Sequence, residues 1–368
     1  MKLSRRNFIG LTLTSGFFAL YNNQISANSN LGISKKKVLI LIEMRGGNDG
    51  LNTIIPYRNS IYYSQRPNIS INNFFKLNSE LALNPMMGSL LPLWEEKKLT
   101  FALGVGWPNP NRSHFMAMDQ WSTGSESGIG KGWLAKISDS IENEQYLLSL
   151  GPTGSNSIEG SKVNSIHFLG NEKNLLSNPS YENMEISNNR KSLKKFLEIE
   201  KFSMNKITEL KNKIQKLPSD IKLPKGQLSK QTATALKIIN TDFPPSLIQM
   251  EIGGFDTHQN QIIRQNRLLK ELSENISALK RGTEKLNKNI ELNIVVTSEF
   301  GRRTKENGSK GTDHGSASIA LLIGDIFKEK FIGKYPDLNN LDERGDLIPN
   351  LYPNDLYGYI QKKIWGSN

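Results

Sequence analysis

The stretch Lys37-Val-Leu-Ile-Leu-Ile-Glu43-Met-Arg45-Gly-Gly-Asn-Asp49-Gly50 decides the fold class of this 368-residue chain. Its first half is a continuous run of aliphatic residues, which is typical of a central strand covered on both faces. Its second half is a glycine-rich loop that carries an aspartate. Because open α/β sheets bind ligands at the carboxyl ends of their strands, the stretch predicts a buried strand with a ligand site at its end.

The rest of the chain alternates between strand patterns and helix patterns. Apolar runs predict strands over 99–104, 245–252, 292–297 and 317–323, with shorter strands near Tyr146 and His167. Helical spacing of apolar residues predicts helices over 84–97, 114–121, 191–216, 232–239, 260–287 and 353–365. This alternation predicts an α/β fold with a mostly parallel sheet, and the weak pattern in between predicts a helical and loop insertion at about 122–230.

Residues 1–27 have the pattern of an export signal. Three basic residues precede an apolar run over 9–21 that is too short to span a bilayer, and Ile25-Ser-Ala27 has the small residues of a cleavage site. Ser4-Arg5-Arg6-Asn7-Phe8-Ile9 closely resembles the twin-arginine signal, with an ordinary secretory signal or an uncleaved anchor as the alternatives. We therefore expect recognition by the twin-arginine export machinery, a location in the periplasm or at the cell surface, and no transmembrane span in the mature chain.

The composition excludes several kinds of chemistry. The chain has no cysteine, so disulfides, thiolate metal sites and cysteine nucleophiles are excluded. Its net charge of +12 would suit nucleic acid, anionic lipid or an acidic polymer, but a general bias toward lysine, asparagine and isoleucine is the simpler cause. The lysines cluster over 191–230 without interleaved aromatic residues and no nucleic-acid-binding motif is present, so no nucleic-acid partner is expected.

Five short motifs place acids and histidines in or beside glycine-rich loops. Three of the four histidines of the chain fall inside these motifs. Imidazole and carboxylate together are the ligands of zinc and manganese sites, and carboxylate oxygens also suit calcium. The motifs are Arg45-Gly-Gly-Asn-Asp49-Gly-Leu-Asn52-Thr53, Asn111-Arg-Ser113-His114-Phe115, Gly253-Gly-Phe-Asp256-Thr-His258, Ser298-Glu299-Phe-Gly301-Arg302 and Gly311-Thr-Asp313-His314-Gly315.

The acidic motifs each allow two interpretations. Asp49 is a hard ligand for a cation or simply caps its own turn. In an extended backbone, Asp256 and His258 lie on one side and can hold one metal, whereas a cap on the following helix is the alternative. Glu299 follows a buried strand, so it is a ligand or the partner of Arg302 in a structural ion pair.

Two further motifs carry groups for acid–base or nucleophilic chemistry. His314 is a metal ligand or acid–base group, or it lies in a surface loop where Asp313 orients it. Ser113 begins a predicted helix, where it is either an ordinary N-cap or a nucleophile whose anion the helix terminus stabilises. In the second case Arg112 would help to hold an anionic ester.

Together, these five motifs are similar to those of a bacterial family of exported twin-arginine-signal proteins of uncharacterised function. That family shows GGNDGLN, RSHF, GG(F/W)DTH, SEFGR and GTDHG in this order. The resemblance covers the signal and the chain from Val38 to Trp365, and it is weakest at about 122–230. The family in turn resembles, more distantly, the alkaline phosphatase and sulfatase superfamily. This resemblance implies one alkaline-phosphatase-like domain over 28–368, a three-layer sandwich around the sheet.

The superfamily resemblance also implies roles for the motif residues. It makes Ser113 the nucleophile, with Arg112 and His114 beside it, and gives Arg302 and Asp313 supporting roles. The implied cofactor is a divalent metal (zinc, manganese or calcium, one or two ions), and its ligands would be Asp49, Asp256, His258, Glu299 and His314.

Two positions depart from the superfamily pattern. Phe300 stands where the superfamily has a histidine ligand, and the spacing from Asp256 to His258 is tighter. One metal, or an altered pair that uses His114 or Asp313, is therefore an equal alternative to a full two-metal site. A sulfatase of the formylglycine type is excluded because the chain has no cysteine.

Two functions follow from these observations. The first is a metal-dependent hydrolase of a small or polymeric anionic ester, phosphate or sulfate, outside the cytoplasm. The second is a catalytically degenerate scaffold of the same fold that binds an envelope polymer, a lipid or a partner protein. The phenylalanine at position 300 favours the second.

Overall fold

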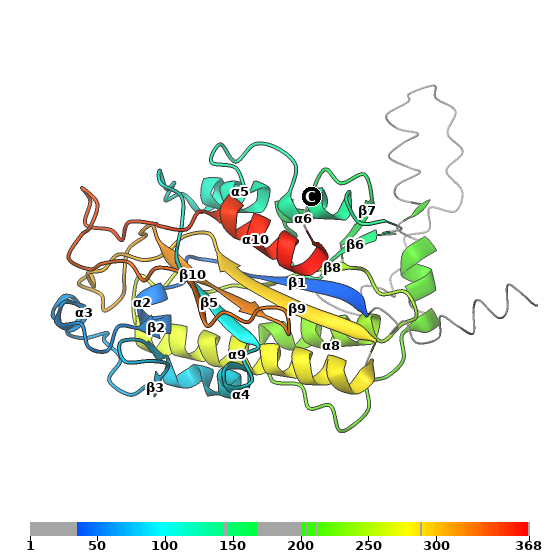
Figure 1. Cartoon of the computed structure of the whole chain (residues 1–368), viewed down its shortest axis with the longest axis horizontal. Coiled ribbons are helices and arrows are strands. Elements are labelled where there is room, and N and C mark those ends of the chain that lie inside the picture. The colour runs from blue at the N-terminus through cyan, green and yellow to red at the C-terminus, as the bar shows by residue number, and fades with distance from the viewer. Residues whose placement is uncertain are drawn as a thin grey trace, which may run out of the picture. The chain divides into compact units, whose positions relative to one another are not determined.

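A central eight-stranded sheet organises the part of the chain that the structure describes. The structure is a computed structural model that describes residues 35–142, 144, 146–167, 201–202, 205–210, 212–287 and 289–366, so the signal predicted over 1–27 lies outside it. The strand order is β11-β5-β10-β9-β1-β8-β6-β7 (Figure 1). The strands are β1 (Lys36–Met44), β5 (Leu99–Val105), β6 (Tyr146–Ser149), β7 (Asn164–His167), β8 (Leu247–Ile252), β9 (Ile290–Ser298), β10 (Ser318–Ile323) and β11 (Phe331–Gly333).

The predicted mostly parallel sheet is confirmed. β1 runs parallel to β8, β8 to β6, β6 to β7, and β11 to β5. β10 runs antiparallel to both of its neighbours, β5 and β9. The carboxyl ends of β1 and β8 therefore lie at the same edge of the sheet, where their following loops meet.

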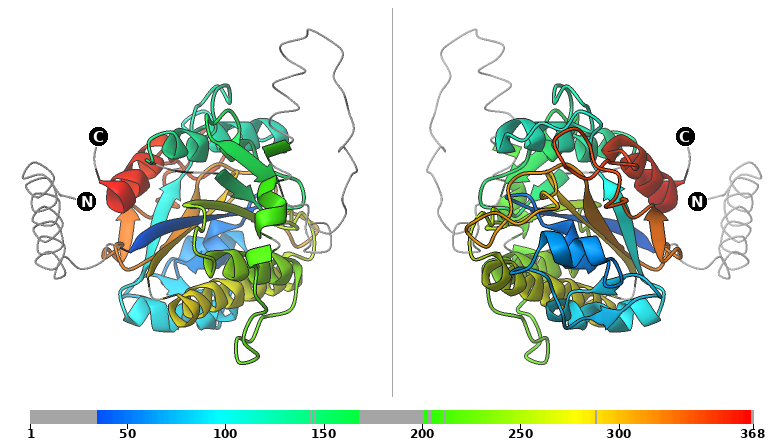
Figure 2. Two further views of the ribbon diagram at one scale, coloured as in Figure 1. Left: turned by 90° about the vertical axis from the view of Figure 1, so that its right-hand side faces the viewer. Right: turned by 90° about the vertical axis from the view of Figure 1, so that its left-hand side faces the viewer.

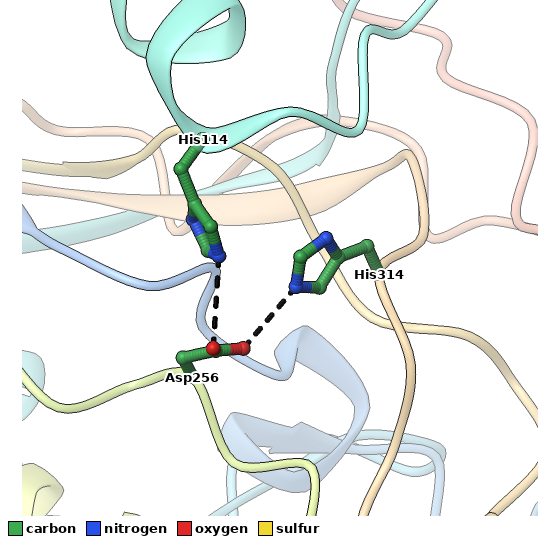
Figure 3. A group of neighbouring side chains, drawn as sticks. All are labelled: His114, Asp256 and His314. Carbon is green, nitrogen blue, oxygen red and sulfur yellow. Dashed lines mark hydrogen bonds and ion pairs between the residues drawn. The ribbon is translucent and has the colours of Figure 1, made fainter.

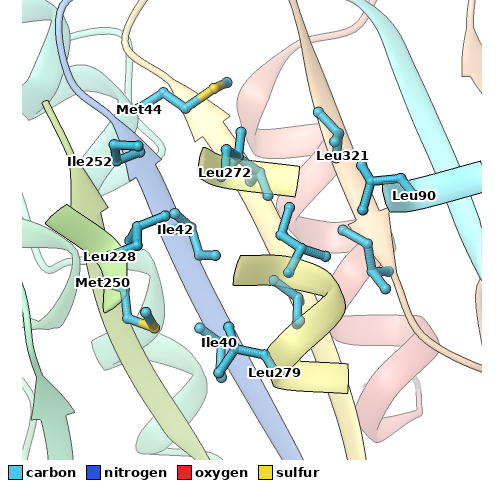
Figure 4. Packing of buried hydrophobic residues seen from close by; sticks show 14 of the residues in the cluster. Ile40, Ile42, Met44, Leu90, Leu228, Met250, Ile252, Leu272, Leu279 and Leu321 are labelled. Carbon is cyan, nitrogen blue, oxygen red and sulfur yellow. The ribbon is translucent and has the colours of Figure 1, made fainter. Parts of the chain in front are cut away.

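Helices cover both faces of the sheet, which confirms the three-layer sandwich (Figures 1 and 2). Leu39 and Leu41 of β1 pack in the cluster of one face. Ile40 and Ile42 pack in the cluster of the other face, which Figure 4 shows. The continuous apolar run of β1 follows from this double coverage. The first face carries α5 (His114–Thr123), α6 (Trp133–Ser138) and α10 (Pro353–Trp365), and the second carries α4 (Leu91–Glu95), α8 (Gln227–Ile239) and α9 (Gln261–Leu286).

Shorter elements fill the connections. A small antiparallel sheet joins β2, β4 and β3. The helix predicted over 84–97 forms over 85–95, but as a short 3-10 helix followed directly by α4 and not as one continuous α-helix. Pro92 explains the break, since proline lacks the backbone donor that a continuous helix needs. These elements are α2 (Gly50–Thr53), β2 (Ile54–Ile55), α3 (Ser60–Gln65), β3 (Phe75–Lys76), β4 (Ala82–Leu83), η1 (Pro85–Leu90) and η2 (Asn156–Ile158).

The segment predicted as an insertion contributes directly to the main sheet. The short strands expected near Tyr146 and His167 are confirmed as β6 and β7, which extend the sheet beyond β8. The sequence pattern did not indicate α6, which packs its apolar side chains on the sheet. Of the helix predicted over 191–216, residues 191–200 lie outside the described residues.

Among the described residues, no helix combines the length and the apolar composition needed to cross a bilayer.

Matched substitutions in α9 test the packing of this helix on the sheet. Ile276 is fully buried, whereas Ile263 of the same helix is 77% exposed. Ile276→Ala should lower the free energy of unfolding by about 2–5 kcal/mol, because it leaves a cavity in the core. Ile263→Ala should change it by less than about 0.5 kcal/mol. Urea denaturation measures both, and equal effects would contradict the described burial of α9.

Candidate metal centre

The loops after β1, β8 and β9 meet at one edge of the sheet. Ser298, the last residue of β9, donates from Oγ to the carbonyl of Met44 at 3.0 Å and accepts from the Asn48 amide at 2.8 Å. The segments 301–303 and 313–315 pair like short antiparallel strands, with a bridge between Arg302 and His314. Motifs that are far apart in the sequence therefore come together here.

Arg302 holds these loops together from the buried side of the site. Its side chain is buried, and every nitrogen of its guanidinium donates to the protein. The acceptors are the carbonyl of Gly47 at 2.7 Å, of Thr312 at 2.8 Å and of Phe255 at 3.0 Å, the carbonyl of Gly46, and Asp256 Oδ1 at 2.6 Å. The planar fork of arginine suits such a fixed set of acceptors.

Three imidazole rings converge on the carboxylate of Asp256. His258 Nε2 lies 3.0 Å from Oδ1, and His314 Nε2 lies 3.2 Å from the same oxygen. His114 Nε2 lies 3.7 Å from Oδ2. Figure 3 shows His114 and His314 pointing toward Asp256 from two different segments.

An acceptor faces the Nδ1 atom of each ring. A carbonyl or an ionised carboxylate can only accept, so a neutral imidazole that donates to it carries its proton on Nδ1 and presents a lone pair at Nε2. This arrangement is the usual one for metal-ligating histidine. The acceptors are Glu299 Oε1 at 3.0 Å from His114, Asp313 Oδ1 at 3.2 Å from His258, and the carbonyl of Arg112 at 2.8 Å from His314.

The donor set fits a divalent cation. Neutral Nε2 lone pairs that face a carboxylate repel it unless a cation or a proton lies between them. The Nε2 atoms of His258 and His314 are 3.0 Å apart, and each lies 3.0–3.2 Å from Asp256 Oδ1. An ion about 2 Å from all three atoms, the usual zinc distance, would fit this triangle. Within the described part of the chain, the ligand atoms of His114, Asp256 and His314 also all lie within 4.8 Å of one another.

The electrostatics of the site favour an ionised Asp256 carboxylate and a neutral His314 imidazole. Burial opposes ionisation of Asp256, but the hydrogen bond and the charge of Arg302, helped by His314, hold its pKa at about 2. Burial lowers the pKa of His314, and the charge of Arg302 lowers it further. The pKa of His114 is raised, chiefly by the hydrogen bond to Glu299.

Two predicted ligands, Asp49 and Glu299, do not face the group around Asp256. Asp49 is buried and caps α2 through the Leu51 amide, and its other oxygen pairs with Arg66 at 2.5 Å. Its carboxylate is thus already satisfied by the protein and is not in the group around Asp256. Glu299 lies behind His114 and accepts from the Gly46 amide at 2.6 Å, so it orients a candidate ligand instead of facing the carboxylate.

The remaining predicted residues surround the group. Ser113 is the N-cap of α5, is exposed, and makes no side-chain hydrogen bond to the helix. Arg112 forms an ion pair with Asp346. Asp313 contacts His258 and not His314, which it was expected to orient; the carbonyl of Arg112 holds His314 instead. The guanidinium of Arg302 is fully buried, and each of its nitrogens already donates to the protein.

Sequence reasoning missed two residues that build the site, Arg66 and Asp346. Arg66 neutralises Asp49, and Asp346 accepts from both Arg112 and Arg303. Neither of these residues lies in a glycine-rich motif with histidine, and their partners are far away in the sequence. For Asp346, the one available signal was Arg303, which directly follows the motif 298–302 and needs an acidic partner.

Comparison with known proteins gives a family. Residues 102–340, more than half of the chain, match the family model DUF1501, which is described as a protein of unknown function. The chain belongs to this family. The family model ends before the closing helix α10 and begins within β5, so all motifs except the first lie inside the match. No curated protein matches the chain in sequence.

Solved structures with a similar arrangement share little sequence with this DUF1501 chain. The C-terminal periplasmic domain of EcEptC from Escherichia coli, in complex with Zn, has 10% identity and a TM-score of 0.44, covering 90% of this chain and 83% of that one. Alkaline phosphatase from the Antarctic bacterium TAB5 has 10% identity and a TM-score of 0.43, covering 91% and 99%. The C-terminal periplasmic domain of phosphoethanolamine transferase EptC from Campylobacter jejuni has 9% identity and a TM-score of 0.40, covering 88% and 87%.

Substitution of Arg302 tests its structural role. Arg302→Met should lower the free energy of unfolding by roughly 3 kcal/mol or more, because buried carbonyls lose charged donors. Arg302→Lys keeps the charge but loses the fork, so it should recover only part of this loss. Arg267→Met, an exposed position on α9, is the control and should have little effect. Chemical denaturation that gave Arg302→Met and the control the same stability would refute this role.

The raised pKa of His114 gives a second prediction. In metal-free protein, Glu299→Gln should bring the pKa of His114 down toward its ordinary value, since the charged acceptor is lost. Because the pKa is raised in the folded state, the ion pair stabilises the fold below the unfolded histidine pKa and stops doing so as pH rises through the folded pKa. NMR titration of the His114 ring measures the shift. An unchanged pKa in Glu299→Gln would exclude Glu299 as its cause.

Proposed function

We propose that this protein is an exported, metal-dependent hydrolase of a phosphate or sulfate ester. The observation that most supports this proposal is the convergence of three imidazole Nε2 atoms on Asp256, each with its Nδ1 held by an acceptor. Metal-ligating histidines almost always donate their other ring N–H to such an acceptor.

The three ligand atoms that lie closest together, Asp256 Oδ1, His258 Nε2 and His314 Nε2, define the proposed ligands. Asp256, His258 and His314 would hold one ion, and nitrogen donors favour zinc or manganese over calcium. The ion, when bound, would stabilise negative charge that develops on the ester during cleavage. Phe300 packs beside the rings of His114 and His314 and offers no ligand atom, so we propose a single ion.

Ser113 is the proposed nucleophile. It lies at the first turn of α5, where backbone amides point outward and favour an anion, and its hydroxyl is not used as a cap. Its oxygen would bond to phosphorus or sulfur as the ester oxygen leaves, and water would then release the inorganic product. We assign His114, the next residue, as the group that takes the hydroxyl proton and returns it to the leaving oxygen.

Metal content and turnover of defined variants test this assignment. Purified protein should carry about one zinc or manganese ion and hydrolyse 4-nitrophenyl phosphate or 4-nitrophenyl sulfate, with activity lost to a chelator and restored by metal. His258→Ala and His314→Ala should lose the metal. His114→Ala should keep the metal and lose roughly 100-fold or more in kcat, as expected for a lost general base. Ser113→Ala should also keep the metal and lose turnover.

Ser79→Ala, in an exposed position of the β3–β4 loop, is the matched control for Ser113→Ala and should retain full activity. Loss of the metal in His114→Ala would make His114 a ligand instead of a base. Full activity in Ser113→Ala would point to direct attack by water.

A degenerate scaffold is the second candidate function. Arg302 already supplies a positive charge to Asp256 Oδ1 at 2.6 Å, and Phe300 replaces a ligand of the related superfamily. Such a protein would bind an envelope polymer, a lipid or a partner protein without turnover. Purified protein with neither bound metal nor hydrolysis of either aryl ester would favour this function.

A further inference from the structure

A hollow beside the histidine group carries an unusual concentration of arginine. It has a volume of about 400 Å³, and its lining joins His258 and His314 to three arginines from three separate segments. The arginines come from the loop before α5, the loop after β9 and the loop between β11 and α10. The lining residues are Arg112, His258, Arg303, Asp313, His314 and Arg344.

One buried carboxylate holds two of these arginines in place. Asp346 is fully buried, and it accepts from Arg303 Nε at 3.2 Å and from Arg112 Nη2. A tight turn fixes Asp346 itself, because Asp342 Oδ1 accepts from the Asp346 amide at 2.8 Å and from the Arg344 amide at 2.9 Å. The two guanidinium groups are therefore oriented before any ligand arrives.

These arginines keep donors that the protein does not use. Arg112 Nε is buried and finds no hydrogen-bond acceptor among the described residues. A buried donor of this kind normally has a partner, so the Arg112 guanidinium retains hydrogen-bonding capacity that the described residues leave unused. Arg344 is exposed. Its backbone carbonyl accepts from Arg303 Nη2 at 2.6 Å, so the two residues lie next to each other in the lining of the hollow.

The acidic and the basic side chains of the lining lie on opposite sides of the hollow. Asp313 lies at the side of His258, where it accepts from that ring and from Asn307. The arginines lie on the other side, where Asp346 and Asp342, the latter 4.0 Å from Arg112 Nη2, balance two of their three charges. An anionic group would therefore bind at the arginine side, where guanidinium forks match the oxygens of phosphate or sulfate.

We propose that this hollow is a subsite for a second anionic group of the substrate, next to the group that is cleaved, and that Asp346 is its positioning residue. The placement of this subsite next to the cleaved group rests on the proposed function, because it assumes that the cleaved ester lies on the histidine group. A volume of about 400 Å³ is in the range of small-molecule sites and leaves room beyond one phosphoryl or sulfuryl group. The substrate class is therefore a molecule with two neighbouring anionic groups.

The first experiment needs no turnover. Isothermal titration of metal-free protein with inorganic sulfate at low ionic strength should show binding that weakens about tenfold or more in Arg303→Ala and in Arg344→Ala. Arg267→Ala, on the exposed side of α9, should bind as the unmodified chain does. Asp346→Asn should weaken binding as well, and Asp346→Glu should restore part of it, provided that circular dichroism shows both variants folded.

The second experiment asks whether the two anionic sites act together. In metal-loaded protein, 1,2-ethanedisulfonate should bind about tenfold or more tightly than methanesulfonate, and Arg344→Ala should abolish this advantage. Because Arg344 is exposed, its substitution should leave the fold intact even if the Asp346 variants do not fold.

The outcomes separate the two proposals. Sulfate affinity that is equal in the unmodified chain, Arg303→Ala and Arg344→Ala would overturn the subsite. Arginine-dependent sulfate binding by a protein with no metal and no turnover would support the subsite and refute the hydrolase. Equal affinity for the two sulfonates, together with active turnover, would refute a substrate with two anionic groups.

Discussion

The site depends on one buried guanidinium. Arg302 binds carbonyls from the loops after β1 and β8 and from the segment before His314, and it also binds Asp256. Hydrogen bonds to charged groups contribute about 1.5–3 kcal/mol each, so this set exceeds any single contact of the site. The loops can approach one another only because Gly46 has no side chain, since a Cβ there would lie 2.3 Å from the Asp256 amide.

The same guanidinium also sets the electrostatics of the site. A buried arginine keeps Asp256 ionised to low pH and disfavours protonated His314. Both effects leave the lone pairs of the site free for a cation. Glu299 acts in the opposite direction on His114, whose pKa it raises. One end of the group is thus suited to holding a metal and the other to exchanging a proton.

The sequence predicted those parts that depend on local pattern. The aliphatic run of β1, the long apolar stripe of α9 and the closing helix α10 are local signals, and the structure confirms them. The motifs also marked the side chains that converge. The pairing of Asp49 with Arg66 and of Arg112 with Asp346 was not predictable, because ion pairing between distant segments leaves no periodic signal. The short strand β11 was missed because three residues are too few to show alternation.

The motif 298–302 holds the site together through several of its residues. Ser298 ties the end of β9 to β1, Glu299 orients His114, and Arg302 fixes the loops. Phe300 packs with its ring centroid 5.0 Å from that of His114 and 4.6 Å from that of His314, and Gly301 lets the chain pass the carbonyl of Ala317.

Phe300 therefore contributes to the site although it offers no ligand atom. An aromatic ring that packs on two imidazoles restricts their rotation, and ligands held in one orientation lose less entropy when they bind. Because Glu299 and the carbonyl of Arg112 already hold the Nδ1 side of His114 and His314, the phenylalanine restrains the same two rings from a second direction. In this physical sense Phe300 supports the orientation of the imidazole rings.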